Sequence, residues 1–87
     1  MYTFKYSSRA VKQLEKLDKS TKKLILKWIE NNLVNCENPR SKGKGLTANR
    51  SGEWRYRIGD YRLICDIQDN ELVILALSVG HRREVYH

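Results

Sequence analysis

The sequence predicts a single α+β domain, a twisted antiparallel sheet with two N-terminal helices packed on one face in the order β-α-α-β-β-β. Three observations support this prediction. Residues 10–33 carry apolar side chains at three- and four-residue spacing, the period of helices. Residues 53–79 alternate or run apolar in the manner of strands, and two tight-turn signals divide them. A chain of 87 residues has room for one core, so one domain is expected over residues 1–87.

The N-terminal elements are expected to be one strand and two helices. Residues 2–6 alternate aromatic side chains with Thr3 and Lys5, which is the period of a half-buried strand. The Ser7–Ser8 pair offers an N-cap for the first helix, and a break with further capping residues spans 18–21. The expected buried stripes are Ala10, Val11, Leu14 and Leu17 in the first helix and Leu24, Ile25, Trp28, Ile29 and Leu33 in the second.

The second half of the chain is expected to be a loop followed by a meander of strands. Residues 35–52 are predicted to form a charged loop, because Asn38–Pro39 and three glycines interrupt every pattern there. The last expected strand, residues 72–79, is apolar on both faces, as expected of a strand in the middle of a sheet. The strands are predicted over residues 53–58, 61–67 and 72–79, joined by tight turns at Gly59–Asp60 and Asp69–Asn70.

The chain is strongly basic, and three arginines are predicted to gather on one face of the sheet. With 17 Lys and Arg against 10 Asp and Glu, the net charge is +7 and the pI near 9.7, which favours polyanionic partners. Arg55 and Arg57 leave the same face of one strand, and Arg62 lies within cross-strand reach. The helices should cover the other face, that of Tyr56 and Leu63. The cluster is either a solvated surface or, as we expect, a phosphate site, because guanidinium groups match phosphate oxygens in pairs.

The C-terminal residues add groups that suit nucleic acid. Arg82 and Arg83 follow the last strand and can fold back over the same arginines. Tyr86 alone would be a packing or tail residue, but beside arginines it is a candidate for stacking on a base. His81 is the one group near this cluster that titrates close to neutral pH. The two cysteines of the chain, Cys36 and Cys65, are expected to be reduced thiols rather than a disulfide.

Missing motifs narrow the chemistry. The sequence has no zinc-type Cys/His cluster, no glycine-rich phosphate loop before a helix and no grouped carboxylates for Mg²⁺, so no metal or cofactor is expected. Metal-free cleavage of a phosphodiester needs a nucleophile inside the substrate, and RNA carries one in its 2′-OH. The longest apolar run, residues 72–77, is too short for a bilayer, and the N-terminus lacks a signal-peptide stretch. We therefore expect a cytoplasmic protein with no membrane partner.

Two segments resemble the RelE branch of the RelE/ParE toxin superfamily: E-W-R-Y-R-I-G-D-Y-R-L-I at residues 53–64 and S-V-G-H-R-R-E-V-Y at residues 78–86. The order of elements matches along nearly the whole chain. The resemblance implies a toxin of a type II toxin–antitoxin module that cleaves mRNA in the ribosomal A site, by 2′-OH attack that leaves a cyclic phosphate. It also implies contacts with ribosomal RNA, a cognate antitoxin with an acidic or amphipathic segment, and binding of operator DNA only through that antitoxin.

The resemblance further implies roles for single residues. Arg55 and Arg57 match two basic residues, lysines in the best-studied member, of which one acts in proton transfer and the other holds RNA. Arg62 matches the arginine that stabilises the transition-state phosphate. Because arginine is a poor general base, His81 is a second candidate for proton transfer. The resemblance implies that Arg82 or Arg83 contacts the leaving group and that Tyr86 stacks on the substrate. The predicted catalytic residues are Arg57, Arg62, His81, Arg82 and Tyr86, and the predicted RNA-binding residues are Lys44, Arg50, Arg55 and Arg83.

Two other interpretations of the basic chain stay open. ParE-type proteins of the same superfamily bind DNA gyrase and cut nothing, although the face of Arg55, Arg57 and Arg62 argues against that activity here. A basic face can also dock an acidic partner without any catalysis.

Overall fold

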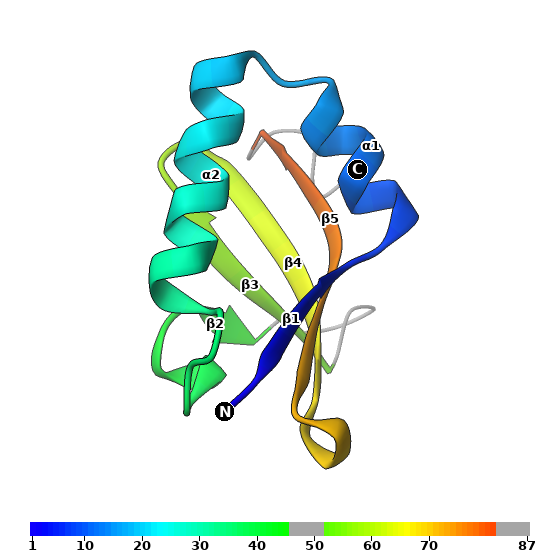
Figure 1. The fold of residues 1–87 in the computed structure, drawn as a ribbon, viewed down its shortest axis with the longest axis vertical. Helices are drawn as coiled ribbons and strands as arrows, with labels where there is room; N and C mark the ends of the chain where they lie inside the picture. Colours follow the sequence, from blue (N-terminus) through cyan, green and yellow to red (C-terminus); the bar gives the residue numbers. More distant parts are fainter. Residues whose placement is uncertain (46–51, 82–87) are drawn as a thin grey trace.

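The computed structural model describes residues 1–45 and 52–81, which form an α+β fold with five strands in one sheet (Figure 1). The predicted fold class is confirmed. The elements are β1 (Thr3–Tyr6), α1 (Ser8–Glu15), α2 (Lys19–Asn32), β2 (Lys44–Gly45), β3 (Glu53–Ile58), β4 (Tyr61–Gln68) and β5 (Val73–His81), with 3₁₀ turns at Pro39–Ser41 and Asp69–Glu71. Neither helix in the described part of the chain is long and apolar enough to cross a membrane.

The sheet is mixed rather than antiparallel throughout. Its order is β1-β5-β4-β3-β2, with antiparallel pairing from β2 to β5 and parallel pairing between β1 and β5. The backbone N–H of Thr3 donates to the carbonyl of Leu72 at 2.8 Å, and that of Ser7 donates to Ala76 at 2.9 Å. The predicted antiparallel direction is therefore wrong for β1. Two helices separate β1 from the meander, so no tight turn sets its direction, and such a long connection permits parallel pairing.

A short strand also interrupts the predicted loop over residues 35–52. Lys44 pairs with Arg55 and Gly45 with Trp54, which adds β2 to the outer edge of β3. Only two residues of each strand pair in this way, so the sequence carries no periodic signal for β2.

Both helices begin where the sequence indicated. The hydroxyl of Ser7 accepts a hydrogen bond from the backbone N–H of Ala10 at 3.1 Å, and a carboxylate oxygen of Asp18 accepts one from Thr21 at 3.2 Å. These N-caps satisfy donors that the first turn of a helix otherwise leaves unpaired. The chain therefore turns between α1 and α2 at Asp18, and both helices pack on the sheet.

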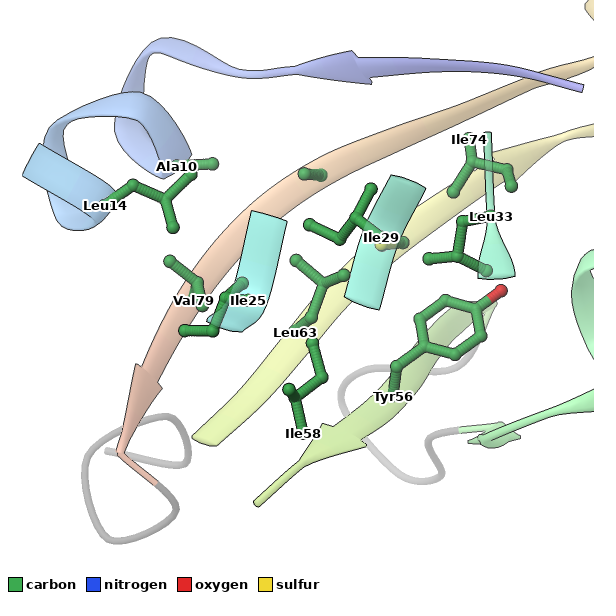
Figure 2. Close-up of a cluster of buried hydrophobic side chains, with 12 residues drawn as sticks. Ala10, Leu14, Ile25, Ile29, Leu33, Tyr56, Ile58, Leu63, Ile74 and Val79 are labelled. Carbon is green, nitrogen blue, oxygen red and sulfur yellow. The ribbon is translucent and has the colours of Figure 1, made fainter. Parts of the chain in front are cut away.

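The hydrophobic core lies between the two helices and one face of the sheet (Figure 2). The helices bury Leu14 and Ile29 against Tyr56 and Leu63, as predicted. Cys36 and Cys65 are free thiols, also as predicted, and burial raises the pKa of both. The buried cluster is Ala10, Leu14, Ile25, Ile29, Leu33, Tyr56, Ile58, Leu63, Cys65, Ile74, Ala76 and Val79.

Two helix residues predicted to be buried are exposed. Val11 is 44% exposed and Leu24 is 57% exposed, whereas Ala10 and Ile25, their chain neighbours, are fully buried. Each helix meets the sheet along a narrow stripe, and a residue one position from its centre is rotated by about 100°. Hydrophobicity alone does not show where that stripe ends.

Arg40 and Asp69 tie the far end of the sheet to the segment that leads into β2. Both terminal nitrogens of Arg40 donate to the two carboxylate oxygens of Asp69 at 2.9 Å, and the hydroxyl of Tyr2 donates to the same carboxylate at 2.7 Å. The hydrogen bonds from Arg40 and then Tyr2 lower the pKa of Asp69 to about 2. This clamp joins the start of β1, the turn at Pro39–Ser41 and the turn before β5.

We expect the clamp to make the stability of the fold sensitive to acid. Because the pKa of Asp69 is lower in the folded chain, its stabilising effect is complete above the ordinary pKa near 4 and disappears as the pH falls toward about 2. Urea unfolding followed by tryptophan fluorescence at a series of pH values measures this loss. Asp69→Asn should flatten the acid dependence in that window. Hydrogen bonds from Ser20 and Thr21 also lower the pKa of Asp18 to about 2, so Asp18→Asn should remove a separate part of the acid dependence and leave the part due to Asp69 in place. An unchanged acid dependence in Asp69→Asn would contradict this role.

Candidate nucleic-acid interface

A groove of about 310 Å³ lies beside β3, between the segment Lys42–Lys44 and α2. Five of its eight lining residues are cationic, and no carboxylate lines it among the described residues. The lining residues are Trp28, Lys42, Gly43, Lys44, Arg55, Tyr56, Arg57 and Arg62. We call this the cationic groove.

The register of the strands brings the cationic side chains together. Arg57 is paired with Arg62 across β3 and β4, and Arg55 is paired with Lys44 across β3 and β2. Directly opposed residues have Cβ atoms about 4.5–5.5 Å apart, and like charges in such pairs destabilise a sheet. A bound anion offsets that repulsion, so the arrangement favours a phosphate-rich ligand.

The sheet face that carries the arginines is less open than the sequence indicated. Arg57 is exposed, and its Nε donates to the carbonyl of Gly59 at 3.4 Å. Arg55 and Arg62 are half-buried, and Ile64, the register partner of Arg55, is completely buried. Of the three arginines predicted on the solvent-facing side, Arg57 is therefore exposed, whereas Arg55 and Arg62 are partly covered. Partial burial weakens screening by water and strengthens each charge's interaction with an anion.

One wall of the groove is a segment of backbone held against β3 by two aromatic side chains. Trp54 Nε1 donates to the carbonyl of Lys42 at 2.6 Å, and the hydroxyl of Tyr56 donates to that of Pro39 at 2.5 Å. Burial raises the pKa of Tyr56, so its hydroxyl stays protonated and keeps donating. Gly43 adopts φ +81° where the segment comes closest to β3. These contacts fix Lys42 and Lys44 at the rim.

The predicted site residues divide into three groups. Arg55, Arg57, Arg62 and Lys44 all line the cationic groove. His81 does not line it: its register partner is Tyr61, whose ring centroid lies 5.7 Å from the imidazole centroid, and Gly80 is the residue paired with Arg62. The remaining predicted residues, Arg50, Arg82, Arg83 and Tyr86, lie outside the described residues.

Sequence reasoning missed four residues that line the groove, Trp28, Lys42, Gly43 and Tyr56. Trp28 and Tyr56 were predicted as core residues, and their rings do pack together with centroids 5.7 Å apart, yet both also reach the groove. Lys42 was treated as a loop charge. The alternation of Lys42 and Lys44 with two glycines was the available signal, because glycine permits close approach of backbone to a neighbouring strand.

The groove can hold an anion and stabilise developing negative charge. Its side chains are hydrogen-bond donors, and guanidinium groups offer planar pairs of N–H groups to phosphate oxygens. None of the described lining residues is a carboxylate or histidine, so this lining supplies no group that accepts a proton near neutral pH. Within residues 1–45 and 52–81, no group of three or more His, Cys, Asp or Glu side chains is arranged to hold a metal ion.

Comparison with known proteins gives one family over nearly the full chain. The sequence profile of the family described as "ParE toxin of type II toxin-antitoxin system, parDE" matches residues 4–86. Toxin RelG of Mycobacterium tuberculosis is 28% identical over 85 residues, which cover 98% of this chain and 95% of that protein.

Solved structures give the same result for the fold. The toxin–antitoxin complex RelBE2 of M. tuberculosis contains a chain similar to this one, with a TM-score of 0.84 and 28% identity over 93% of this chain and 98% of that chain. The archaeal RelE–RelB complex of Pyrococcus horikoshii matches with a TM-score of 0.71 and 28% identity, covering 97% and 98% of the two chains. The isolated RelE toxin of Escherichia coli, at 24% identity and a TM-score of 0.69 over 99% and 92%, shares the fold.

Proposed function

The chain belongs to the RelE/ParE superfamily of toxins from type II toxin–antitoxin modules, and we propose that it inhibits translation as a ribosome-dependent mRNA endoribonuclease. The observation that carries this proposal is the cationic groove, where Arg55, Arg57 and Arg62 meet Lys44 at the edge of the sheet. Cations that converge on one spot suit a single phosphate on which negative charge develops.

The proposed reaction is transesterification within the RNA. The 2′-OH attacks the adjacent phosphorus, the bond from phosphorus to the 5′-oxygen breaks, and the products are a 2′,3′-cyclic phosphate and a 5′-OH. No metal or cofactor takes part. Arg62 stabilises the extra negative charge of the phosphorane, and one well-aimed group of this kind supplies about 3–4 kcal/mol. Arg55 and Lys44 hold the neighbouring phosphates, and Arg57 lies across from Arg62 at the reacting group.

Proton transfer and base stacking are assigned by resemblance to other members. Arg82 is proposed to serve the leaving group, Tyr86 to stack on a base, and Arg50 and Arg83 to bind RNA. The proton acceptor is left between His81 and Arg57. Because His81 pairs with Tyr61 and does not line the groove, His81→Ala is the direct test, and undiminished cleavage by that variant would remove the role. Because the described groove lining contains no base, alignment of the 2′-OH by the ribosome is proposed to supply a large part of the rate.

The proposed partners follow from the same module. Several similar structures are complexes of a toxin with its antitoxin, so we propose a cognate antitoxin here, through which operator DNA is bound. The proposed substrate is mRNA in the ribosomal A site, contacted together with ribosomal RNA, in the cytoplasm. Phosphate contacts from the basic surface would position the protein on the RNA and would not select a sequence.

A programmed ribosome with a defined codon in the A site tests the function. We expect one cleavage site in that codon, with a cyclic phosphate end, and no cleavage when the nucleotide before the break is 2′-deoxy. Little cleavage of the same RNA is expected without ribosomes. A metal-assisted nuclease would instead cut the 2′-deoxy substrate and leave a 3′-OH. A ParE-like gyrase inhibitor would leave mRNA intact in induced cells and damage DNA, and a docking module would do neither.

A further inference from the structure

Trp28 brings an aromatic residue into a groove whose other lining is mainly cationic. It lies on α2, is partly buried, and lines the cationic groove together with Lys42, Lys44 and Arg55. The cations explain how the groove would hold phosphates, but they do not explain an aromatic residue among them. The lining therefore suits a ligand that is both anionic and aromatic.

The neighbours of Trp28 hold it in place before any ligand binds. Tyr56 is completely buried, and its hydroxyl donates to the carbonyl of Pro39, so its ring has a fixed position. The Trp28 ring packs against it with centroids 5.7 Å apart and planes inclined by 53°. A side chain that is already ordered loses little conformational entropy on binding. Trp28 is therefore a preorganised contact surface.

The charge and size of the groove indicate which aromatic ligand fits. Five of the eight described lining residues are cationic and none is a carboxylate, so a cation over the indole face would be repelled. The volume of about 310 Å³ lies within the roughly 300–1,000 Å³ of small-ligand sites. Proteins that bind single-stranded nucleic acid combine a cationic groove with aromatic side chains on which bases stack. A nucleotide unit of RNA has the matching chemistry.

Trp28 lies toward the Lys44 end of the groove. A Cβ on Gly43 would lie 3.0 Å from Cδ1 of Tyr56, so the backbone of the segment before Lys44 passes directly over the Tyr56 ring. Tyr56 therefore connects Trp28 to that segment. Lys44 is in turn paired with Arg55, which places two cations at the same end of the groove.

The two cross-strand pairs of cations are spaced for neighbouring phosphates. Lys44 pairs with Arg55, and Arg57 pairs with Arg62. Arg55 and Arg57 are two residues apart on β3, which is about 6.6–6.8 Å along a strand. Neighbouring phosphates of a single RNA strand lie at a comparable separation. A phosphate next to the reacting one therefore fits between Lys44 and Arg55.

From this arrangement we propose that Trp28 is the stacking platform for the base of a nucleotide that adjoins the scissile bond, a role that rests on the proposed function. The indole stacks on the base while Lys44 and Arg55 hold the phosphate of that nucleotide. Purines present a larger aromatic face than pyrimidines, so the platform favours a purine at this position. Trp28 thereby adds a preference for base size to a groove whose cations do not select a sequence.

Binding of two short RNA chains tests the platform without any cleavage. One is an oligoadenylate, and the other is an abasic chain of the same length, which keeps the phosphates and lacks the bases. We expect Trp28→Leu to weaken oligoadenylate about fivefold or more and to leave the abasic chain nearly unchanged. Lys44→Ala should weaken both chains equally, because it removes a phosphate contact. Equal effects of Trp28→Leu on the two chains would overturn the proposal.

A packing control and a measurement on the unaltered chain separate stacking from misfolding. Leu17 also packs against the core but lies off the groove, so Leu17→Ala should leave the ratio of the two affinities unchanged. In the wild-type chain, stacking should quench tryptophan fluorescence more at saturating oligoadenylate than at saturating abasic chain. Trp54, the other tryptophan, donates its indole N–H to Lys42 and supplies a background common to both titrations. Equal quenching by the two chains would also refute the platform.

Cleavage on programmed ribosomes tests the preference for base size. A purine and a pyrimidine are exchanged in turn at each nucleotide flanking the break. The wild-type chain should cleave faster with a purine on one side, and Trp28→Leu should lose that difference. Trp28-dependent binding of oligoadenylate by a chain that cleaves no mRNA would refute the ribonuclease and leave the platform standing. Cleavage that is equally fast with either base, together with binding independent of Trp28, would refute the platform and leave the ribonuclease standing.

Discussion

Replacing Arg62 with alanine is expected to lower the single-turnover rate of mRNA cleavage on programmed ribosomes by about 10²–10³-fold. Arg62 lies on β4, directly opposite Arg57, and is half-buried in the cationic groove, so its charge acts on the phosphate with little screening by water. The loss should appear in the rate at saturating toxin rather than in binding alone, because the charge it offsets develops in the transition state. Growth inhibition after induction should fall with it.

Two further variants make this result specific to Arg62. Arg9→Ala removes the same charge from an exposed position on α1 and should leave cleavage close to wild type. Arg62→Lys keeps a charge but loses the planar pair of donors, so an intermediate rate is expected. Circular dichroism and thermal unfolding show whether each variant is folded. A folded Arg62→Ala variant that cleaves within about threefold of wild type would contradict the proposed function.

Gly43→Ala is expected to destabilise the fold and to weaken RNA binding together. At φ +81° an L-residue is strained, which alone costs about 1–2 kcal/mol. A Cβ at this position would also lie 2.2 Å from the carbonyl oxygen of Arg55 and 2.7 Å from Trp54 Nε1. The segment must then move off β3, which displaces Lys42 and Lys44 from the groove. Urea unfolding and titration with an RNA oligonucleotide measure the two effects.

Gly59 provides the matched control for Gly43. It has a similar backbone angle, φ +60°, but a Cβ there would have no atom within 4 Å among its surroundings. Gly59→Ala should therefore be destabilised only by the strain of its backbone angle. If both variants lose the same stability, the close approach of Gly43 to β3 contributes nothing measurable.

The elements that the sequence predicted well depend on local signals. The strand over residues 53–58, the Gly59–Asp60 turn and the caps at Ser7 and Asp18 all have the predicted bounds. Each depends on residues within a few positions of one another, where side-chain spacing and turn propensity act directly. The direction of β1 depends on pairing with a strand some 70 residues away, and no local pattern reports it.

The candidate site shows the same division. A period-two strand and a two-residue turn were sufficient to predict that Arg55, Arg57 and Arg62 share a face, and all three line the same groove. Trp28 and Lys42 come from other elements and reach the groove only because α2 and the segment before β2 lie beside β3. His81 lies on β5 together with Ser78 and Gly80, yet it pairs with Tyr61 and does not line the groove of the arginines.

By itself the sequence determined the basic character of this protein, its core and the arginines of its sheet, because charge and periodicity are properties of the chain that folding preserves. Tertiary structure alone decided where those arginines meet other cations, how deeply they are buried and which helix face remains uncovered. These features depend on which distant segments come into contact. Both the position of a charge and its burial set how strongly it interacts with an anion.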